Sequence, residues 1–472
     1  MMVVLDVTIV NIALPSAQRT LHFSTDSRQW IITAYALAFG SLLLLGGKLG
    51  DLFGRKWTFI AGLIGFAVAS AIGGLAQSFG MLVAARALQG AFGALLAPSA
   101  LSLLTVTFHG STDRAKAFGI FSAIAGGGAS VGLVLGGALT EALSWRWCLY
   151  VNLLIAIPTA ITALRLLRNE AQPERPRIDL PGVLIASSGL FAIVFGFSSA
   201  ETSSWSAPMT IVALAVSAPL LAAFVARERR VEFPLLPLHI VWDRARGGAY
   251  ASIALVGSGV FADFLFLTFY MQENLGFSPL TTGLAFLPMT GMIVLTATTV
   301  QTRVLQHTGA RPVVIFGTTI GIIAMFIFTH LTPNGHYASQ ILPGLILTGL
   351  GVGCIFAPAF ATATLGVKPT EAGVASAMVN TSQQVGGSVG TALLSTIFAS
   401  AAASYATSHA HTAALHDAAA VYGYTSAFWA AAGLFALALV VAVVVLPADG
   451  ASRARAAQAD AVSEHSLRIE AQ

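Results

Sequence analysis

Three charged residues stand inside long apolar stretches of the chain: Asp6, Arg86 and Asp263. A charged side chain at the centre of a membrane helix costs about 2.5–3.5 kcal/mol on the insertion scale, so such residues mark a functional site or a structural pair. Burial disfavours the charged form of an acid and a neighbouring cation favours it, so an Asp beside a movable Arg can take up and release a proton. We therefore predict that these residues transfer protons. The alternatives are an Asp–Arg pair that only holds helices together, and acids that line a wet cavity without titrating.

Polar and aromatic side chains in the same stretches are candidates for a substrate cavity. Gln89 follows Arg86 by three residues, so both side chains project from one face of a helix. Phenylalanines around a cavity would accept bulky amphipathic molecules, although most phenylalanines in membrane helices face lipid or other helices. Asp263 would act there as a second titratable acid or as the counter-charge of a cationic substrate. The residues predicted to line the cavity are Asn11, Gln89, Phe261, Phe264, Gln272 and Phe356.

A charged decapeptide at 47–56 separates two long apolar runs. Its glycines allow a tight turn, and its single acid, Asp51, stands within a few residues of three cations. Such a cluster can lock and unlock one arrangement of the helices. Short cytoplasmic loops are basic in most membrane proteins, but that tendency requires neither the acid nor the glycine spacing. The predicted latch consists of Gly47, Asp51, Gly54, Arg55 and Lys56, with Lys48 as the third nearby cation.

Glycines recur at every fourth residue in the stretch 116–139. Gly128, Gly132 and Gly136 share one helix face, and Gly137 follows them. A face without side chains lets a neighbouring helix approach closely. We predict that these four glycines form a hinge, with plain helix packing as the alternative.

The elements that carry these residues are membrane helices. Of the 472 residues, 56% are hydrophobic and 9% are charged, and the mean hydropathy is +0.80, whereas about a quarter of the residues of a soluble domain are charged. An apolar run of about 20 residues crosses the hydrocarbon layer as a helix. Such runs fill nearly the whole chain, which predicts an all-α polytopic membrane protein without a sizeable water-soluble domain.

Fourteen spans are predicted, and their loops differ in charge. Lys and Arg gather in alternate loops and in the C-terminal tail, and only Arg19, Arg28, Arg86 and Arg146 fall elsewhere. Because cytoplasmic loops carry an excess of these cations, both termini are predicted to lie in the cytoplasm. The spans are 1–14, 30–49, 57–75, 80–106, 116–139, 147–166, 180–199, 209–226, 248–272, 281–305, 312–331, 340–365, 373–402 and 424–446.

The first predicted span is short for a membrane helix. At 1.5 Å per residue, 14 residues reach about 21 Å, less than the hydrocarbon thickness of about 30 Å. The chain begins without a basic segment or a cleavage site, so this span is not a signal peptide. We expect a natural start about 15 residues upstream, which would complete the span.

The chain repeats itself weakly at an offset near 260 residues. Gly93–Pro98 resembles Gly353–Pro358, the turn at Gly54 resembles that at Gly309, and Asp6 matches Asp263. These matches predict two six-helix bundles facing each other, as alternating access requires. The predicted domains are an N-terminal bundle at 1–166, linkers with inserted seventh and eighth helices at 167–247, a C-terminal bundle at 248–446 and a disordered cytoplasmic tail at 447–472.

Several of these stretches resemble one family. Leu5–Pro15 is similar to the first-helix signature of the fourteen-helix drug:proton antiporters of the major facilitator superfamily, the EmrB/QacA type. The turn at 47–56, the Arg86 helix, the glycine face at 128–137 and Trp145–Asn152 follow in the family's order. The resemblance implies the major facilitator fold and proton-coupled efflux of drugs. It also implies proton transfer by Asp6 and Arg86, a latch at Asp51 and a hinge at the glycines.

Two departures from the family pattern leave alternatives open. Leu133 stands where many antiporters have proline, and the equivalent loop at 309–311 lacks the acid and the first arginine. A solute:proton symporter or a sensor that does not transport therefore remains an alternative on the same fold. A membrane enzyme would need His, Asp, Glu or Cys gathered at one membrane face, and the sequence shows no such pattern.

The expected partners are a small-molecule substrate, protons and the lipid bilayer of the cell membrane. No GxxxxGK[ST] sequence is present to hold a nucleotide, so the energy source is predicted to be ionic. The net charge of +4 comes from loops and reports topology, not binding of nucleic acid. Cys148 and Cys354 lie far apart in apolar spans, so we expect no disulfide framework, no metal and no cofactor. The protein is expected to be a monomer.

Overall fold

The computed structural model describes residues 1–23, 25–108, 111–167, 179–409 and 415–447. Every regular element within these ranges is a helix, and the described residues contain no strand. This agrees with the predicted all-α class. A helix bonds all of its interior N–H and C=O groups within itself, which is what an apolar run needs where no water is present.

The helices form two compact units that are described separately. Unit 1 consists of Met1–Thr107, Gly128–Asp243 and Val367–Val385, and unit 2 of Phe108–Gly127, Arg244–Gly366 and Gly386–Gln472. Two long helices, α5 (Ser111–Ala142) and α16 (Ala372–Ser408), continue from one unit into the other. The predicted domain boundaries near 166, 247 and 446 stay a prediction, because the compact units follow contacts and not chain order.

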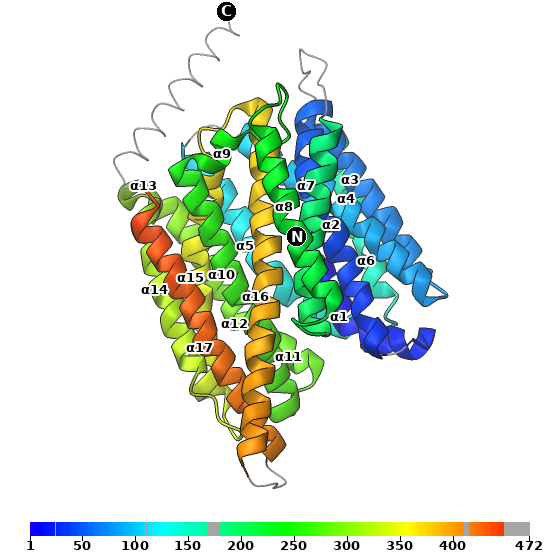
Figure 1. Cartoon of the computed structure of the whole chain (residues 1–472), viewed down its shortest axis with the longest axis vertical. Helices are drawn as coiled ribbons and strands as arrows, with labels where there is room; N and C mark the ends of the chain where they lie inside the picture. The colour runs from blue at the N-terminus through cyan, green and yellow to red at the C-terminus, as the bar shows by residue number, and fades with distance from the viewer. Residues whose placement is uncertain (24, 109–110, 168–178, 410–414, 448–472) are drawn as a thin grey trace, which may run out of the picture. The chain divides into compact units, whose positions relative to one another are not determined.

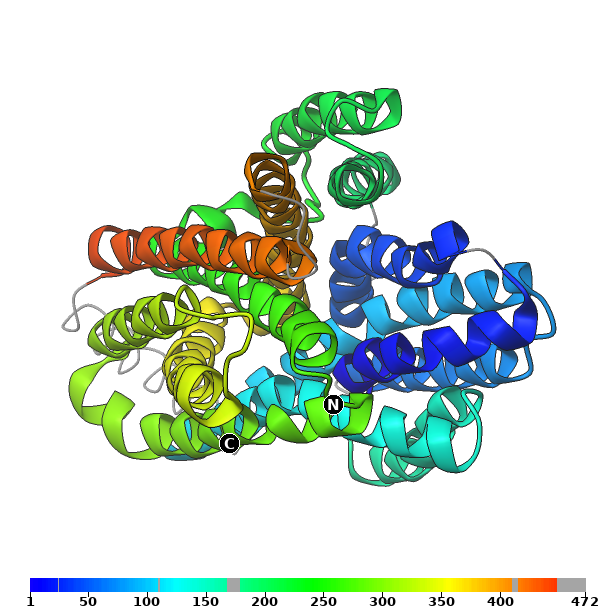
Figure 2. The ribbon, with the colours of Figure 1, turned by 90° about the horizontal axis from the view of Figure 1, so that it is seen from below.

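Unit 1 contains the first helices of the chain and the inserted pair. Its other helices are α1 (Met2–Leu21), α2 (Thr25–Phe53), α3 (Arg55–Gly74), α4 (Phe79–Thr107), α6 (Trp147–Leu166), α7 (Leu180–Thr202), α8 (Pro208–Glu228), α9 (Leu238–Trp242) and the short η4 (Pro369–Glu371). Helix α2 packs against α4, and α3 against α4 and α6 (Figure 1). The inserted helices α7 and α8 lie beside each other (Figure 2), and α7 also contacts α2.

Unit 2 contains the later helices. They are α10 (Arg244–Phe269), η1 (Tyr270–Asn274), α11 (Pro279–Ala285), α12 (Leu287–Thr299), η2 (Val300–Val304), α13 (Leu305–Thr308), α14 (Ala310–Phe328), η3 (Tyr337–Ile341), α15 (Leu342–Ala363) and α17 (Leu415–Val444). Figure 1 shows α14 and α17 side by side, and α15 packs against α12 and α14. Three of the short elements, η1, η2 and η3, are π-helical turns.

Helix geometry at two pairs of positions agrees with the predicted repeat. Pro98 lies inside α4 and Pro358 inside α15. Gly54 and Gly309 precede α3 and α14 with φ angles of 91° and 81°, a backbone conformation that strongly favours glycine. Each of these two pairs therefore has one member in unit 1 and one in unit 2.

The predicted number of fourteen spans is not confirmed. Among the described residues, 12 helices are long and apolar enough to cross a membrane. The predicted first and fifth spans coincide with α1 and α5, which are not among these 12. In α5, the apolar stretches Lys116–Ala125 and Val131–Ala142 are separated by a segment in which the side chains of residues 129 and 130 lie outside the described part of the chain.

Candidate functional site

A buried polar cluster in unit 1 brings together side chains from four helices. Asp6 projects from α1, Ser70 from α3, Arg86 and Gln89 from α4, and Asn152 from α6. Arg86 is 2% exposed, and the other four side chains belong to residues that are 0% exposed. The helical spacing of Arg86 and Gln89 places both side chains on the face of α4 that meets α1, as predicted from the sequence.

The centre of the cluster is an ion pair. Arg86 Nη1 donates to Asp6 Oδ2 at 2.5 Å and to Gln89 Oε1 at 2.8 Å. Taking two charges out of water is expensive, and their attraction compensates only where the geometry is good and the remaining polar atoms are bonded. The structure thus joins two of the three residues that we predicted for proton transfer.

Two amides complete the coordination of the acid. Asp6 Oδ1 accepts from Gln89 Nε2 at 3.0 Å and from Asn152 Nδ2 at 2.7 Å. The same two amide groups donate to Ser70 Oγ, at 2.6 Å from Gln89 and 3.3 Å from Asn152. The Asp6 carboxylate thus accepts from three donors on two helices, α4 and α6, so a change at this one group would affect several bonds together.

The guanidinium of Arg86 has a further aromatic and a backbone neighbour. It lies over the ring of Tyr35, 4.4 Å from the ring centre, and its Nε donates to the Ile31 carbonyl at 3.4 Å. The Tyr35 hydroxyl and Asn152 Oδ1 are buried and have no hydrogen-bond partner among the described residues. Both atoms therefore keep an unused hydrogen-bonding capacity beside the ion pair.

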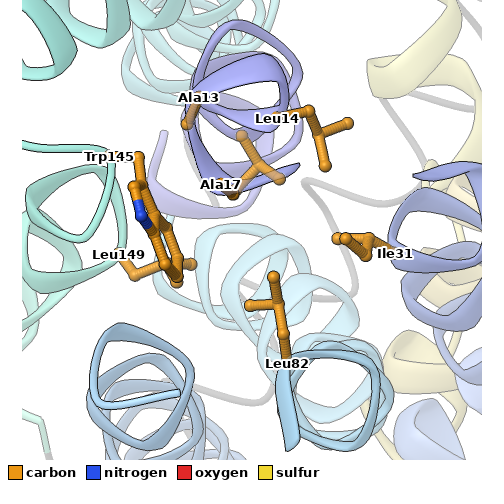
Figure 3. A pocket seen from close by; sticks show the side chains of 8 residues that line it. Ala13, Leu14, Ala17, Ile31, Leu82, Trp145 and Leu149 are labelled. Atoms are coloured by element: carbon orange, nitrogen blue, oxygen red, sulfur yellow. The ribbon is translucent and has the colours of Figure 1, made fainter. Parts of the chain in front are cut away.

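A small apolar cavity adjoins the cluster (Figure 3). Leu82 lies one helical turn before Arg86, and Ile31, whose carbonyl binds Arg86, also lines the cavity. The side chains that line it are apolar apart from the indole nitrogen of Trp145, so the cavity offers few partners to water. The complete lining is Val10, Ala13, Leu14, Ala17, Ile31, Leu82, Trp145 and Leu149.

The predicted latch residue Asp51 binds the beginning of another helix. Its Oδ1 accepts from Gly373 N at 2.8 Å and its Oδ2 from Val374 N at 3.1 Å, both in the first turn of α16. The first N–H groups of a helix have no partner inside the helix, and its N-terminus carries a partial positive charge. The carboxylate therefore satisfies two donors and the helix dipole at once.

The other latch residues surround this contact. Arg55 lies 3.4 Å from Asp51, donates from Nε to Ser102 Oγ at 2.7 Å and also binds the Pro369 carbonyl just before α16. Gly47 lies against Gly373, because a Cβ atom at residue 47 would stand 2.5 Å from the Gly373 carbonyl oxygen. The turn that begins α3 is formed by Gly54. Lys56 lies apart from the acid and donates to the Leu164 carbonyl at 3.0 Å.

The glycine face of α5 packs against α1. A Cβ at Gly132 would stand 2.9 Å from the Leu5 carbonyl oxygen, and one at Gly136 would stand 2.9 Å from Ile9 Cγ1. Gly128 lies against Val4, and Gly137 is buried. The predicted close approach is present, and it holds α5 against the helix that carries Asp6.

The predicted acid of unit 2, Asp263, is buried on α10. The hydroxyl of Thr348 on α15 is its polar neighbour, and neither carboxylate oxygen makes a hydrogen bond of ordinary geometry within the described part of the chain. An ionised carboxylate buried without a partner carries a desolvation cost of several kcal/mol. A proton or a cationic group would remove that cost.

The predicted cavity residues of unit 2 have different environments. Phe264 packs on Phe286 with ring centres 5.1 Å apart, and Phe356 stacks on Phe360 at 5.5 Å. Phe261 is 45% exposed, and Gln272 is partly buried at η1. The side chain of Asn11 lies outside the described residues.

Comparison with known proteins places the chain in a family. The sequence model of the Major Facilitator Superfamily matches residues 1–391. The chain belongs to this family of membrane transporters. The expected superfamily and its fold are thereby confirmed, whereas the fourteen-helix subfamily stays a prediction. The protein is a multi-pass membrane transporter of small molecules and not an enzyme.

Curated relatives cover most of this transporter. It is 46% identical over 449 residues to the puromycin resistance protein pur8 of Streptomyces alboniger, covering 94% of this chain and 89% of the relative. It is 38% identical to the cephamycin export protein CmcT of Amycolatopsis lactamdurans, covering 84% and 82% of the two chains. The crystal structure of the human organic anion transporter MFSD10 shares the fold, with a TM-score of 0.61, 15% identity and 93% and 97% coverage.

Sequence reasoning missed three members of the transporter's polar cluster. Ser70, Tyr35 and Asn152 were not predicted as site residues, although Asn152 was noted in the family resemblance. An Asn in an apolar span is itself a signal, because a buried amide needs partners. Ser70 and Tyr35 gave no such signal, since hydroxyl groups are common in membrane helices and Ser can bond its own backbone.

Proposed function

We propose that this transporter exports drug-like or amphipathic small molecules, in exchange for protons, by alternating access in the cytoplasmic membrane. The observation that carries the proposal is the ion pair between Arg86 and Asp6, enclosed in a cluster of buried amides. The names of the relatives, which confer resistance to puromycin or export cephamycin, support export of antibiotics.

In this proposal, the Asp6 carboxylate is the proton carrier. When a proton binds Asp6, the attraction to Arg86 is lost, and the two amides that donate to Oδ1 must find other acceptors. Arg86 remains charged, because a guanidinium cannot lose its proton in a protein. It is then free to move toward Tyr35 or toward a substrate group, which links protonation to a change in the positions of α1 and α4.

The proposed latch controls the conformational change. Asp51 and Arg55 hold the first turn of α16, and α16 continues beyond Val385 into unit 2. Release of these bonds would free that helix. The glycine face at Gly128, Gly132, Gly136 and Gly137 would let α5 move along α1.

Several finer assignments belong to the same proposal. We assign the transporter to the fourteen-helix antiporters, counting α1, whose 20 residues span about 30 Å, and α5 as the two remaining spans. Both termini are placed in the cytoplasm, because the cations concentrate in the loops at that face. Asp263 is proposed as the second ionisable group, facing a proton or a cationic substrate, and the transporter is proposed to act as a monomer.

Proton flux in proteoliposomes tests the proposal. Purified protein is reconstituted with an acidic lumen, and lumenal pH is followed while puromycin, other lipophilic cations or neutral antibiotics are added. Substrate-dependent loss of the pH gradient is expected, and Asp6→Asn and Arg86→Ala should abolish it. Glu141→Gln, at an exposed acid of α5, is the matched control and should keep it.

The direction of coupled movement decides between the alternatives. Protons and solute moving in the same direction would identify a symporter, which Leu133 in place of the antiporter proline leaves open. Binding of the compounds without any flux would identify a sensor. Either result would overturn the proposed antiport.

A further inference from the structure

The segment that joins the inserted helices to unit 2 folds back onto helix α8. We call residues 229–243, which include α9, the strap. At its beginning, Arg230 N and Val231 N donate to the Arg227 carbonyl, and further along Leu236 N donates to Glu228 Oε2 at 2.9 Å. Glu228 is 5% exposed, so this carboxylate is committed to the strap. The strap therefore follows a defined path along the end of α8.

Apolar side chains of the strap are buried together with both helices of the latch. Leu235 and Leu236 share one hydrophobic cluster with Leu44 of α2 and with Val374 and Ala377 of α16. The same cluster contains Val183, Ala186 and Leu190 of α7 and Phe224 of α8. The strap thus fills the space where the inserted pair, α2 and the start of α16 meet.

Polar contacts tie the strap to each side of the Asp51 latch. Lys48, one turn before Asp51 on α2, donates from Nζ to the Pro234 carbonyl at 2.8 Å. His239 Nε2 lies 3.1 Å from Glu371 Oε2, and Glu371 directly precedes α16. The strap consequently contacts both of the helices that the latch holds together.

The inserted helices provide a firm base for the strap. Arg227, near the end of α8, binds the Asp179 carboxylate with Nε at 2.8 Å and with Nη2 at 2.7 Å. Asp179 is the residue before α7, so this bidentate pair fastens the ends of α7 and α8 to each other. The strap begins two residues after Arg227.

We infer that the strap is a second clasp of the conformational latch, which holds α2 and the start of α16 together from the α7–α8 pair. The inference deepens the proposed function, on which it rests, and it gives the inserted helices a role in conformational control. When the latch opens, the strap stays with α2 and α8, where Glu228 and Lys48 bind its backbone. It releases η4 and α16, where it makes the contact between His239, whose side chain is 57% exposed, and Glu371.

Hydrogen exchange of the full-length protein in detergent tests this clasp without any transport measurement. Leu236→Ser should speed exchange in two peptides, the strap itself and the first turn of α16 with Gly373 and Val374, because loss of the clasp lets the latch open more often. His239→Ala, at a side chain that is 57% exposed, should speed exchange in the α16 peptide to a smaller extent. Leu184→Ser, at an exposed leucine of α7, is the matched control and should leave both peptides unchanged.

The two peptides distinguish the possible results. Faster exchange in the strap of Leu236→Ser, with the α16 peptide as in the wild type, would overturn the inference, because the strap would then loosen without affecting the latch. If Leu236→Ser does not fold, His239→Ala decides alone, and unchanged α16 exchange in that variant refutes the clasp. Failure of the proposed antiport would appear in the proton-flux assay and would leave these exchange results intact.

Discussion

The buried ion pair between Asp6 and Arg86 makes a quantitative prediction for a double-mutant cycle. Each single substitution, Asp6→Asn or Arg86→Met, leaves one buried charge without its partner, a change that costs about 3–5 kcal/mol. The double substitution removes both charges and keeps an acceptor oxygen for the two neighbouring amides, so we expect it to cost about 1–2 kcal/mol. The two residues should therefore be coupled by roughly 4 kcal/mol or more.

The two single variants should also differ from each other. In Arg86→Met, the remaining Asp6 can take up a proton and so lose its charge, whereas in Asp6→Asn the guanidinium keeps its charge. Asp6→Asn is therefore expected to be the more destabilising substitution. This order of stabilities depends on exclusion of water from the pair, and the exposed fractions are 0% for Asp6 and 2% for Arg86.

Equilibrium unfolding of the purified protein in mixed micelles measures these free energies. Tryptophan fluorescence is a suitable signal, because Trp145 lines the cavity next to the cluster. Glu141→Gln removes an exposed carboxylate and should leave the free energy of unfolding within about 0.5 kcal/mol of the wild type. Additive single effects, or an Arg86→Met variant that is less stable than Asp6→Asn, would refute the reasoning.

Four further predictions concern the latch, the glycine face, the inserted helices and unit 2. Asp51→Asn keeps one acceptor for the α16 amides and loses the other, so it should weaken the latch by about 1.5–3 kcal/mol, seen as faster amide exchange in the first turn of α16. Gly132→Ala should destabilise the protein by about 1–3 kcal/mol in the unfolding assay, whereas Gly291→Ala, with nothing within 4 Å of the new Cβ, should stay near zero. The hydrogen bonds from Arg227 hold the pKa of the Asp179 carboxyl below its usual value. The ionised carboxylate therefore stabilises the folded protein above the unfolded-state pKa, and this stabilisation is lost as pH falls through the lower folded-state pKa. In the unfolding assay, Asp179→Asn should reduce stability at neutral pH and match the wild type at strongly acidic pH. Asp263→Asn should abolish resistance to cationic compounds and spare neutral ones, and equal loss of both in growth assays would reject a role in cation recognition.

Much of the fold was predictable because the membrane restricts what an apolar run can do. Runs such as 57–75 and 147–166 became α3 and α6 with ends shifted by two residues or fewer, since a chain without water must bond its backbone within a helix. The number of membrane spans was predicted less well. Helix α5 combines glycine, serine and charged residues with its apolar ones, so it is less apolar than helices such as α3 and α6.

The site residues that carry a charge could be predicted, because a charge within an apolar span has a high free-energy cost. The uncharged contacts of the site could not be predicted in this way. Asp6 and Arg86 were found because a charge in an apolar run demands a partner, and the structure supplies that partner at 2.5 Å. Only one of the contacts of Asp51, that with Arg55, was expected from the sequence. We expected nearby cations, and the closest contacts are backbone amides of α16, more than 300 positions later in the chain. Every residue except proline has a backbone N–H group, so the sequence does not show which of these groups bind Asp51. This contact is visible only in the folded structure.

The turns before α3 and α14, which correspond in the weak internal repeat, each place a cation against the end of another helix. Lys56 of the first turn donates to the Leu164 carbonyl in the last turn of α6, at 3.0 Å. Arg311 of the second turn donates to the Val443 carbonyl in the last turn of α17, at 2.5 Å. In each unit the cation satisfies carbonyl groups that have no partner inside their helix and faces the negative end of the helix dipole.

This correspondence separates two roles within the predicted latch. The cation recurs in both units because each unit has the same helix end to satisfy, so Lys56 is a structural residue of unit 1. The acid occurs only in the first turn, where Asp51 binds the start of α16, and the second turn has no acid. A residue that every unit needs is retained in both turns, whereas a residue that acts on one moving helix is needed once. The asymmetry of the two turns therefore supports the proposal that Asp51 and Arg55, and not the recurring cation Lys56, are the groups whose bonds break when the transporter changes conformation.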